Sequence, residues 1–403
     1  MTSGVHDETT RVMRIGQQLD TLAIEIPSWG FGNTGTRFKV FSWPGAARTV
    51  YEKIADAALI HRLTGRCPTV AIHIPWDRVD DWEGLRRYTV DLGLRIGSVN
   101  PNLFQDDDYR LGSLCHPVER VRRKAIGHVL ECIEIAEQVG SSIISLWLAD
   151  GTNYPGQDSL LERKRRLLAS LTEICRHLPS GMTLLLEYKF FEPAFYHTDL
   201  ADWGMAYLVS RELGPQVKVL VDLGHHPLGT NVEQIVAWLL DEDKLGGFHF
   251  NSRKYADDDL VTGSINPFEL FLIFHEIVSA MEDPRTQGTA KKIAYMIDQS
   301  AVIESKLEAI LQAVVAIETT FVKALLVDRA QLRAAQEHGD ILEAYRLLQD
   351  AYETDVRPLL AQIRRERGLP ADPIRALREG GYEAQRAQQR GAAAATGGYA
   401  TAR

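Results

Sequence analysis

Four side chains that could bind a metal ion stand at the ends of four apolar stretches of the chain. They are Glu187, Asp222, His249 and Asp298. Three carboxylates that meet within a few ångströms repel one another strongly unless a cation lies between them. A lone histidine between two phenylalanines, such as His249, is more often a core residue, so the interpretation depends on all four together. Oxygen-rich ligation with one imidazole suits Mn²⁺, Mg²⁺ or Co²⁺ better than a metal that prefers thiolates.

A second group of possible ligands lies close to the first in the sequence. His225 follows Asp222 by three residues, and Asp257 and Asp259 stand in the acidic run DDD. In an extended loop, alternate residues point to the same side, which would pair the two carboxylates. An acidic run by itself is typical of a solvated loop, but beside His225 and the first group it predicts a second metal site. Two metals a few ångströms apart can hold and polarise neighbouring oxygens of one substrate.

Further side chains with rings or hydrogen-bonding groups stand at the ends of other apolar stretches. They are His73, Trp76, Asn100, Trp147 and Lys189. Indole faces that stack on C–H bonds, together with a few polar groups, are typical of a sugar pocket. A simpler interpretation stays open for each: a tryptophan can serve packing alone, and Lys189 can merely pair with a carboxylate.

The elements that must position these residues are short apolar strands that alternate with helices. We expect strands over residues 21–29, 69–76, 94–104, 142–150, 183–191, 217–226, 246–253 and 291–300. We expect helices over residues 9–19, 46–62, 79–91, 117–139, 158–178, 200–213, 232–240, 267–280 and 303–326, with Pro117 as the first residue of its helix. Such alternation implies parallel pairing with right-handed crossovers. Eight such units close into an α/β fold of the (β/α)8 TIM barrel type, in which the carboxyl ends of the strands converge on one face. A doubly wound open sheet is the alternative.

The barrel is not expected to occupy the whole chain. We divide the sequence into an N-terminal extension (1–20), the barrel (21–327), a C-terminal helical extension (328–390) and a disordered tail (391–403). Residues 329–367 are rich in Ala, Leu, Gln, Glu and Arg, which predicts one or two amphipathic helices. The tail is of low complexity, which favours disorder.

The glycine-rich segment GFGNTG, residues 30–35, matches the pattern of dinucleotide-binding loops. In that pattern the last glycine opens a helix whose N-terminus binds the pyrophosphate. Here an extended stretch and Pro44 follow. We therefore interpret the segment as a loop that reaches over a site and not as a nicotinamide site.

Composition narrows the class of protein. The 403 residues carry a formal net charge of −9, which argues against nucleic acid as a partner. Four cysteines without CxxC spacing are expected to be reduced core residues: Cys67, Cys115, Cys132 and Cys175. No apolar run reaches the roughly 18 residues that span a bilayer, and the polar N-terminus shows no signal sequence. We expect a cytoplasmic protein with no membrane partner.

Seven segments between residues 25 and 330 resemble the xylose-isomerase-like barrel superfamily. Within it they are most similar to the L-rhamnose isomerases of the broad-specificity bacterial type. The segments are SWGFGNTGTRF, AIHIPWD, LWLADGTNYPGQD, LEYKFFEPAFYHTD, VDLGHHPLGTNVEQIVAWLL, GGFHFNSRKYADDDL and MIDQS. VDLGHH together with FHFNSRKYADDD is the most specific part of this resemblance.

The resemblance implies a homotetrameric isomerase of small sugars that interconverts L-rhamnose and L-rhamnulose and often acts on D-allose. It implies two Mn²⁺ per subunit, with Co²⁺, Mg²⁺ or Zn²⁺ as substitutes. The first metal would be held by residues matching Glu187, Asp222, His249 and Asp298, and the second by those matching His225, Asp257 and Asp259. Residues matching sugar contacts are His73, Trp76, Trp147, Lys189, His225, Ser300 and Phe38, the last of which reaches into a neighbouring subunit's site.

Two chemical routes would move a hydrogen between adjacent carbons of an aldose. In a metal-assisted hydride shift it passes directly between the carbons, and in an enediol route a positioned base removes it as a proton. No carboxylate is left over as a base, which favours the hydride shift with Lys189, His73 and Asp298 as catalytic residues.

Three other functions stay open on the same fold. A sugar 3-epimerase would use two glutamates as acid and base, whereas the eighth strand offers Asp298. A metal-dependent phosphoesterase would need basic residues near the metal, and the acidic DDD loop disfavours it. The non-enzymatic alternative is a sugar-binding barrel with a structural cation.

Overall fold

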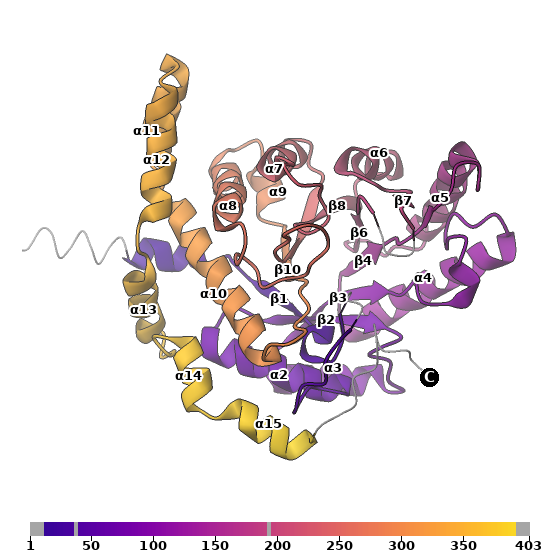
Figure 1. Ribbon diagram of the computed structural model, residues 1–403, viewed down its shortest axis with the longest axis horizontal. Coiled ribbons are helices and arrows are strands. Elements are labelled where there is room, and N and C mark those ends of the chain that lie inside the picture. The colour runs from indigo at the N-terminus through magenta and orange to yellow at the C-terminus, as the bar shows by residue number, and fades with distance from the viewer. Residues whose placement is uncertain (1–11, 36–38, 192–194, 392–403) are drawn as a thin grey trace, which may run out of the picture.

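Residues 12–35, 39–191 and 195–391 are described by the computed structural model of the chain. Among them, eight parallel strands close into a barrel in the order β1, β10, β9, β8, β6, β4, β3, β2 (Figure 1). Their bounds are β1 Ile24–Pro27, β2 Thr69–Ile74, β3 Arg95–Pro101, β4 Ile143–Trp147, β6 Thr183–Glu187, β8 Val217–Asp222, β9 Leu245–Phe250 and β10 Ala294–Ile297. The predicted (β/α)8 TIM barrel is confirmed. The open sheet is wrong because β1 pairs with both β2 and β10.

The strands are apolar because both of their faces are covered. Every residue of β9 is buried, and in β8 only Lys218 is partly exposed. Helices cover the outer face, and side chains such as Leu185, Leu220 and Met296 pack together in a cluster of their own. The strands end earlier than the apolar runs predict, so the polar residues at their carboxyl ends lie at the rim.

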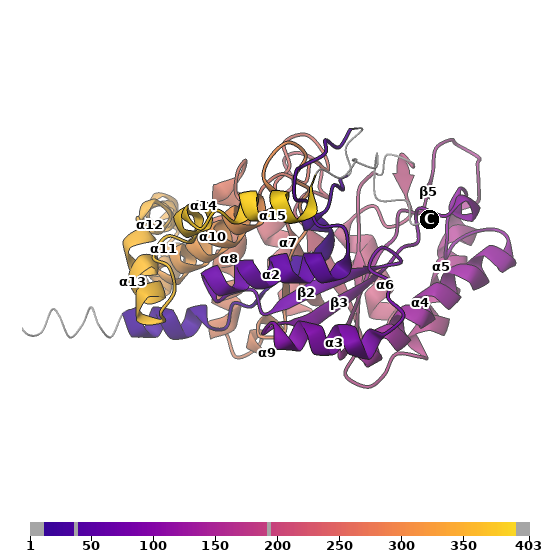
Figure 2. The same cartoon turned by 90° about the horizontal axis from the view of Figure 1, so that it is seen from below.

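Helices between the strands surround the barrel (Figures 1 and 2). They are α2 Val50–Thr64, α3 Trp82–Asp91, α4 Glu119–Val139, α5 Leu160–Cys175, α6 Trp203–Leu213, α7 Val232–Asp241, α8 Pro267–Glu282, the short α9 Gln287–Ala290 and α10 Lys306–Leu325. Residues 12–19 are also helical. Polar caps fix several starts: the side chains of Thr49 and Ser305 accept hydrogen bonds from first-turn N–H groups of α2 and α10.

Several local predictions are wrong. Pro117 is not the first residue of α4, because the N–H of Val118 donates to His116 Nδ1 and holds this stretch in a turn before Glu119. The helix α9 and a small antiparallel pair, β5 Gly151–Thr152 and β7 His197–Thr198, were not predicted. Two short 3-10 helices also occur, Ser28–Phe31 and Asp107–Tyr109.

Five helices follow α10 within the described residues. They are α11 Arg329–His338, α12 Ile341–Glu353, α13 Arg357–Glu366, α14 Pro373–Glu379 and α15 Tyr382–Arg390. Three of them fall in residues 329–367, where one or two were predicted. Gly339 adopts a left-handed φ of 68° and ends α11, and extended Thr354 ends α12. In Figure 1 the α11–α12 pair stands out from the barrel, while α13 to α15 run back along it.

The four cysteines are free, as predicted; three are buried and Cys175 is partly exposed. The glycine-rich segment does not lead directly into a helix, since described residues 39–49 are irregular and α2 begins at Val50. Among the described residues no single helix is long and apolar enough to cross a membrane. The helices α10 and α11 meet that test only jointly, as a pair bent by 63°.

Candidate active site

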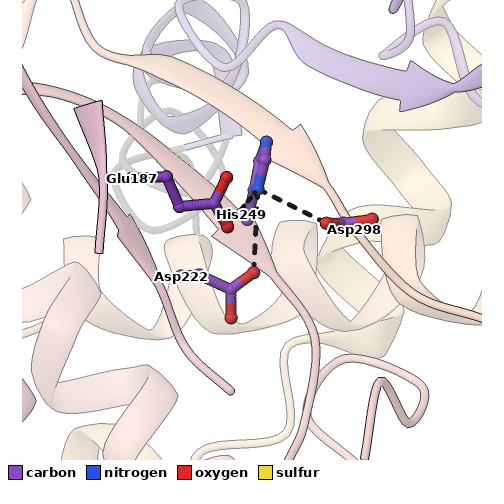
Figure 3. Close-up of side chains that lie close together, drawn as sticks. All are labelled: Glu187, Asp222, His249 and Asp298. Atoms are coloured by element: carbon purple, nitrogen blue, oxygen red, sulfur yellow. Dashed lines mark ion pairs between the residues drawn. The ribbon is translucent and has the colours of Figure 1, made fainter. Parts of the chain in front are cut away.

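The structure brings four predicted ligands together at the carboxyl ends of neighbouring strands: Glu187 of β6, Asp222 of β8, His249 of β9 and Asp298 after β10 (Figure 3). Their ligand atoms all lie within 4.8 Å of one another. The Nδ1 atom of His249 lies 3.1 Å from Glu187 Oε1, 3.4 Å from Asp298 Oδ2 and 3.7 Å from Asp222 Oδ2. One ion could therefore contact all four side chains.

Strand register explains why these residues meet. Asp222 is paired with His249 across β8 and β9, and His249 is paired with Met296 across β9 and β10. Paired residues of neighbouring parallel strands lie at the same height and share a face. Asp298 follows two residues after Met296, and its N–H donates to Phe250 O at 3.0 Å, which continues the same ladder.

Burial and crowding shift the pKa values of this group. Burial raises the pKa of Asp222 to about 7, and the nearby Glu187 carboxylate adds to the rise. Burial alone would lower the pKa of His249, but the surrounding carboxylates, Glu187 foremost, raise it to about 10. The carboxylates thus favour a positive charge at the point where the four side chains meet.

The buried Nδ1 atom of His249 has no hydrogen-bond partner among the described residues. Three carboxylate oxygens lie within 3.7 Å of it. A ring nitrogen and three carboxylates that face one point make a hard, oxygen-rich donor set. Such a set fits Mn²⁺ or Mg²⁺ and not a metal that requires thiolates.

A second group of possible ligands adjoins the first and shares Asp222 with it. It consists of Asp222, His225 and Asp257. His225 Nε2 lies 3.4 Å from Asp257 Oδ1 and 3.9 Å from Asp222 Oδ1. The other ring nitrogen, Nδ1, lies 3.0 Å from the carbonyl oxygen of Tyr188, which orients the ring.

Asp259 lies outside this second group of ligand atoms. It is buried, lines the same cavity and accepts a hydrogen bond from Ser300 Oγ at 3.3 Å. The expected extended loop is wrong at this residue, whose φ of 48° turns the backbone into the left-handed region. Burial and then the Asp257 carboxylate raise the pKa of Asp259 well above its usual value.

Lys189 stands in the cavity between the ligands and an indole ring. Its Nζ donates to Asp257 Oδ2 at 2.6 Å and lies 4.8 Å from the centre of the Trp147 ring. The side chain is 2% exposed. The lysine therefore pairs with a carboxylate, and its ammonium group also lies on the wall of the cavity.

Aromatic rings form another part of the cavity wall. The rings of His73 and Trp76 stack with centroids 3.7 Å apart, and Phe104 lies 4.6 Å from Trp147. Burial, followed by the positive charges of Lys53 and His128, lowers the pKa of His73 well below its usual value. His73 is therefore neutral over the physiological range and can donate one hydrogen bond and accept another.

The sequence analysis did not single out several residues of the site. Trp29, Phe104 and Ser145 line the cavity, and Asn251 donates a hydrogen bond to Asp222. Trp29 Nε1 donates to Asp298 Oδ1 at 2.8 Å, from a 3-10 helix that the strand pattern could not reveal. The predicted sugar contact Phe38 lies outside the described residues.

Comparison with known proteins places the chain in a family. Residues 66–298 match the family described as xylose isomerase-like TIM barrel. The chain belongs to this xylose isomerase-like family. A probable sugar isomerase of Rhizobium meliloti (strain 1021) is 42% identical over 400 residues, which cover 96% of this chain and 92% of that protein. A probable sugar isomerase of Mesorhizobium japonicum is 42% identical over 95% of this chain and 89% of its own length.

Solved structures of proteins with much lower sequence identity share the fold of this xylose isomerase-like family member. An L-ribulose 3-epimerase is 16% identical, with a TM-score of 0.54 over 76% of this chain and 97% of its own. A D-psicose 3-epimerase with D-tagatose from Clostridium cellulolyticum H10 is 12% identical, with a TM-score of 0.51 over 75% and 96%. At these identities the likeness establishes the barrel fold.

Proposed function

We propose that this protein is a metal-dependent aldose–ketose isomerase, with L-rhamnose and L-rhamnulose as its main pair and D-allose as a further substrate. The observation that carries the proposal is a pair of ligand groups that share Asp222 in a cavity walled by indole and imidazole rings. Relatives with 42% identity that bear the name probable sugar isomerase support the same reaction class.

We propose Mn²⁺ as the cofactor, with two ions per subunit. The first ion would be held by Glu187, Asp222, His249 and Asp298, and the second by His225, Asp257 and Asp259. The unpartnered His249 Nδ1 and the oxygen-rich donor set fit the first ion. For the second ion, His225 and Asp257 lie together with Asp222, and Asp259 lines the cavity beside them. When bound, the ions supply Lewis acidity that polarises the sugar oxygens next to the reacting carbons.

The remaining side chains of the cavity would bind and orient the sugar. The buried ammonium group of Lys189 would donate a hydrogen bond to a sugar oxygen, and the neutral ring of His73 would accept or donate another. Trp76 and Trp147 would offer flat faces to the C–H bonds of the sugar. Together these groups would fix the distance between the two reacting carbons and the ligand groups.

We further propose that the subunits assemble into a homotetramer. Large apolar side chains on the outer faces of α6 and α7 support a subunit contact: Met205 is 46% exposed, Leu208 50% and Trp238 57%. Light scattering of the purified protein would give the mass directly. A mass of one subunit at micromolar concentration would contradict the assembly.

A panel of aldoses at fixed Mn²⁺ tests the proposed reaction. L-rhamnose, D-allose, several other aldoses and, in parallel, several ketoses are incubated with the protein, with and without excess EDTA, and the products are identified by NMR. We expect L-rhamnulose from L-rhamnose and little product after chelation. Conversion of ketoses to their C3 epimers without aldose formation would instead identify a sugar 3-epimerase, and no product from any sugar would contradict both.

A further inference from the structure

The guanidinium group of Arg163 is the centre of a buried cluster outside the ligand groups. Arg163 belongs to α5 and is 1% exposed. Its Nε and Nη2 each donate to a different oxygen of Asp199, both at 2.8 Å, which makes a two-pronged ion pair. The same side chain donates to Cys115 Sγ at 2.9 Å, Leu111 O at 3.1 Å and Asp158 Oδ2 at 3.2 Å.

The cluster also contains a set of possible metal ligands, Cys115, Asp150 and Asp199. Arg163 Nη2 lies 2.9 Å from the sulfur and 2.8 Å from Asp199 Oδ2. The guanidinium group therefore supplies the positive charge that a metal would otherwise bring. Burial and then the two carboxylates raise the pKa of Cys115 well above its usual value, so the thiol stays protonated.

Asp199 connects this cluster to the backbone of Lys189. Asp199 follows β7, and its own N–H donates to Asp150 O at 3.0 Å. The residues on either side of it hold Lys189: Thr198 Oγ1 donates to Lys189 O at 2.5 Å, and the Lys189 N–H donates to Leu200 O at 3.0 Å. The carbonyl and the N–H group of Lys189 thus both form hydrogen bonds to residues next to Asp199, which the ion pair with Arg163 holds in place.

We propose that Arg163 is a positioning residue: through Asp199 it fixes residues 198–200, and these fix the height at which Lys189 enters the cavity. The ammonium group of Lys189 then lies between Asp257 and the Trp147 ring. A planar, two-pronged guanidinium group is required because a lysine at this position could not hold both oxygens of Asp199. Only the naming of a sugar as the ligand of Lys189 rests on the proposed function.

The first test compares Arg163→Lys with Arg166→Lys. Arg166 lies on the same helix and is partly buried, and it donates to Cys115 O at 2.6 Å and Asp158 Oδ2 at 2.5 Å, not to residues 198–200. Each variant keeps the positive charge and loses one guanidinium group on α5. Arg166→Lys therefore shows how much such a loss disturbs the helix in general. Asp199→Asn breaks the ion pair from the other side and serves if Arg163→Lys does not fold.

Hydrogen exchange, followed by mass spectrometry, measures how well the backbone amides are protected and does not require enzymatic activity. We expect peptides containing Lys189 and Leu200 to exchange about tenfold faster in Arg163→Lys and Asp199→Asn than in Arg166→Lys. Equal exchange in all three variants would overturn the inference. This comparison stays decisive even if the protein converts no aldose.

The affinity for a sugar analogue tests whether the position of Lys189 in the cavity has changed. L-rhamnitol, which has no carbonyl group and cannot be isomerised, is titrated into Mn²⁺-loaded protein by calorimetry. We expect its Kd to rise about tenfold in Arg163→Lys and little in Arg166→Lys. Because Arg163 acts through Lys189, its effect on Kd should vanish in a Lys189→Met background. A full effect in that background would overturn the inference, whereas no L-rhamnitol binding by the unchanged protein would contradict the proposed function alone.

Discussion

The side-chain amide of Asn251 donates hydrogen bonds to both oxygens of Asp222, at 3.0 and 3.1 Å. The backbone N–H of Gly224 adds another bond to Asp222 Oδ1 at 2.6 Å. Asp222 is the residue that both ligand groups share. Its orientation is therefore set by two groups that are not themselves ligands, as is common around metal sites.

Replacing Asn251 by leucine should weaken metal binding without removing a ligand. The change keeps the volume of the side chain but leaves one carboxylate of the site with fewer donors. We expect the Kd for Mn²⁺, measured by equilibrium dialysis, to rise by about 10–100-fold. Asn102→Leu, at another buried asparagine outside the ligand groups, should leave the Kd unchanged. Equal affinity in both variants would mean that Gly224 alone fixes Asp222.

The Asp222→Asn variant should lose metal and activity together. Both ligand groups include this carboxylate, so its neutralisation removes charge from each of them. We expect kcat/KM for L-rhamnose to fall by more than about 100-fold and the bound Mn²⁺, measured by elemental analysis after dialysis, to fall in parallel. Full turnover by this variant in EDTA would show that the carboxylate has no metal-binding role.

The sequence was sufficient to predict the barrel and to predict that four residues far apart in the chain lie together in the first ligand group. Strand–helix alternation has few closed solutions, and in a barrel every strand end faces the same rim. Glu187 and Asp298 could thus be placed together although more than a hundred residues separate them. The type of residue at each strand end then indicated the chemistry.

Other features could not be read from the sequence because they depend on packing or on single turns. Asn251 and Trp29 act on Asp222 and Asp298 through side-chain directions that no periodicity encodes. Asp259 leaves the expected extended path because its backbone is left-handed, which is rare for a residue other than glycine. The ends of α11 and α12 each depend on the backbone conformation of a single residue, left-handed at Gly339 and extended at Thr354.

Deuterium at C2 of the aldose should be retained at C1 of the ketose. Each carboxylate among the described residues that line the cavity is a proposed metal ligand: Glu187, Asp257, Asp259 and Asp298. No further carboxylate stands there as a base, which favours direct transfer of the hydrogen between carbons. NMR of the ketose formed in ordinary water measures the label. Washout of most of the deuterium within one turnover would favour an enediol route.

Glu318 should anchor the C-terminal helices to the barrel. This residue of α10 is 0% exposed and accepts from Arg66 Nε at 3.1 Å and from Arg364 Nη2, on α13, at 2.5 Å. Glu318→Ala removes the carboxylate that the two buried guanidinium groups share, while Arg66 keeps its ion pair with Asp20. We expect the free energy of unfolding in urea to fall by about 3–5 kcal/mol.

The matched control for Glu318 is an ion pair of similar length on the surface. Arg346 and Asp350 lie 2.5 Å apart on the exposed face of α12. Asp350→Ala should change the free energy of unfolding far less, because solvent screens an exposed pair. Similar losses in the two variants would mean that burial does not strengthen the contribution of Glu318.

Glu25 should make the protein less stable as pH rises from about 4.5 to about 7. Burial raises the pKa of Glu25 from 4.5 to about 7, although hydrogen bonds from Ser98 and Thr69 oppose the rise. Below pH 4.5 the carboxyl group is protonated in both states and has no effect. Between the two values the unfolded chain releases the proton while the folded protein retains it, so the folded state binds more protons and loses stability with pH. Above pH 7 the loss is complete, on the order of 3 kcal/mol.

The measurement is urea unfolding in EDTA at pH values from 4.5 to 8. Glu25→Gln cannot ionise, so the difference in stability between the variant and the unchanged protein should move in favour of the variant as pH rises to about 7 and then level off. Glu337→Gln, on the exposed part of α11, should run parallel to the unchanged protein. A difference between Glu25→Gln and the unchanged protein that stays constant over this range would show that Glu25 ionises at its ordinary pKa, and hence that water reaches the barrel interior beside Ser98.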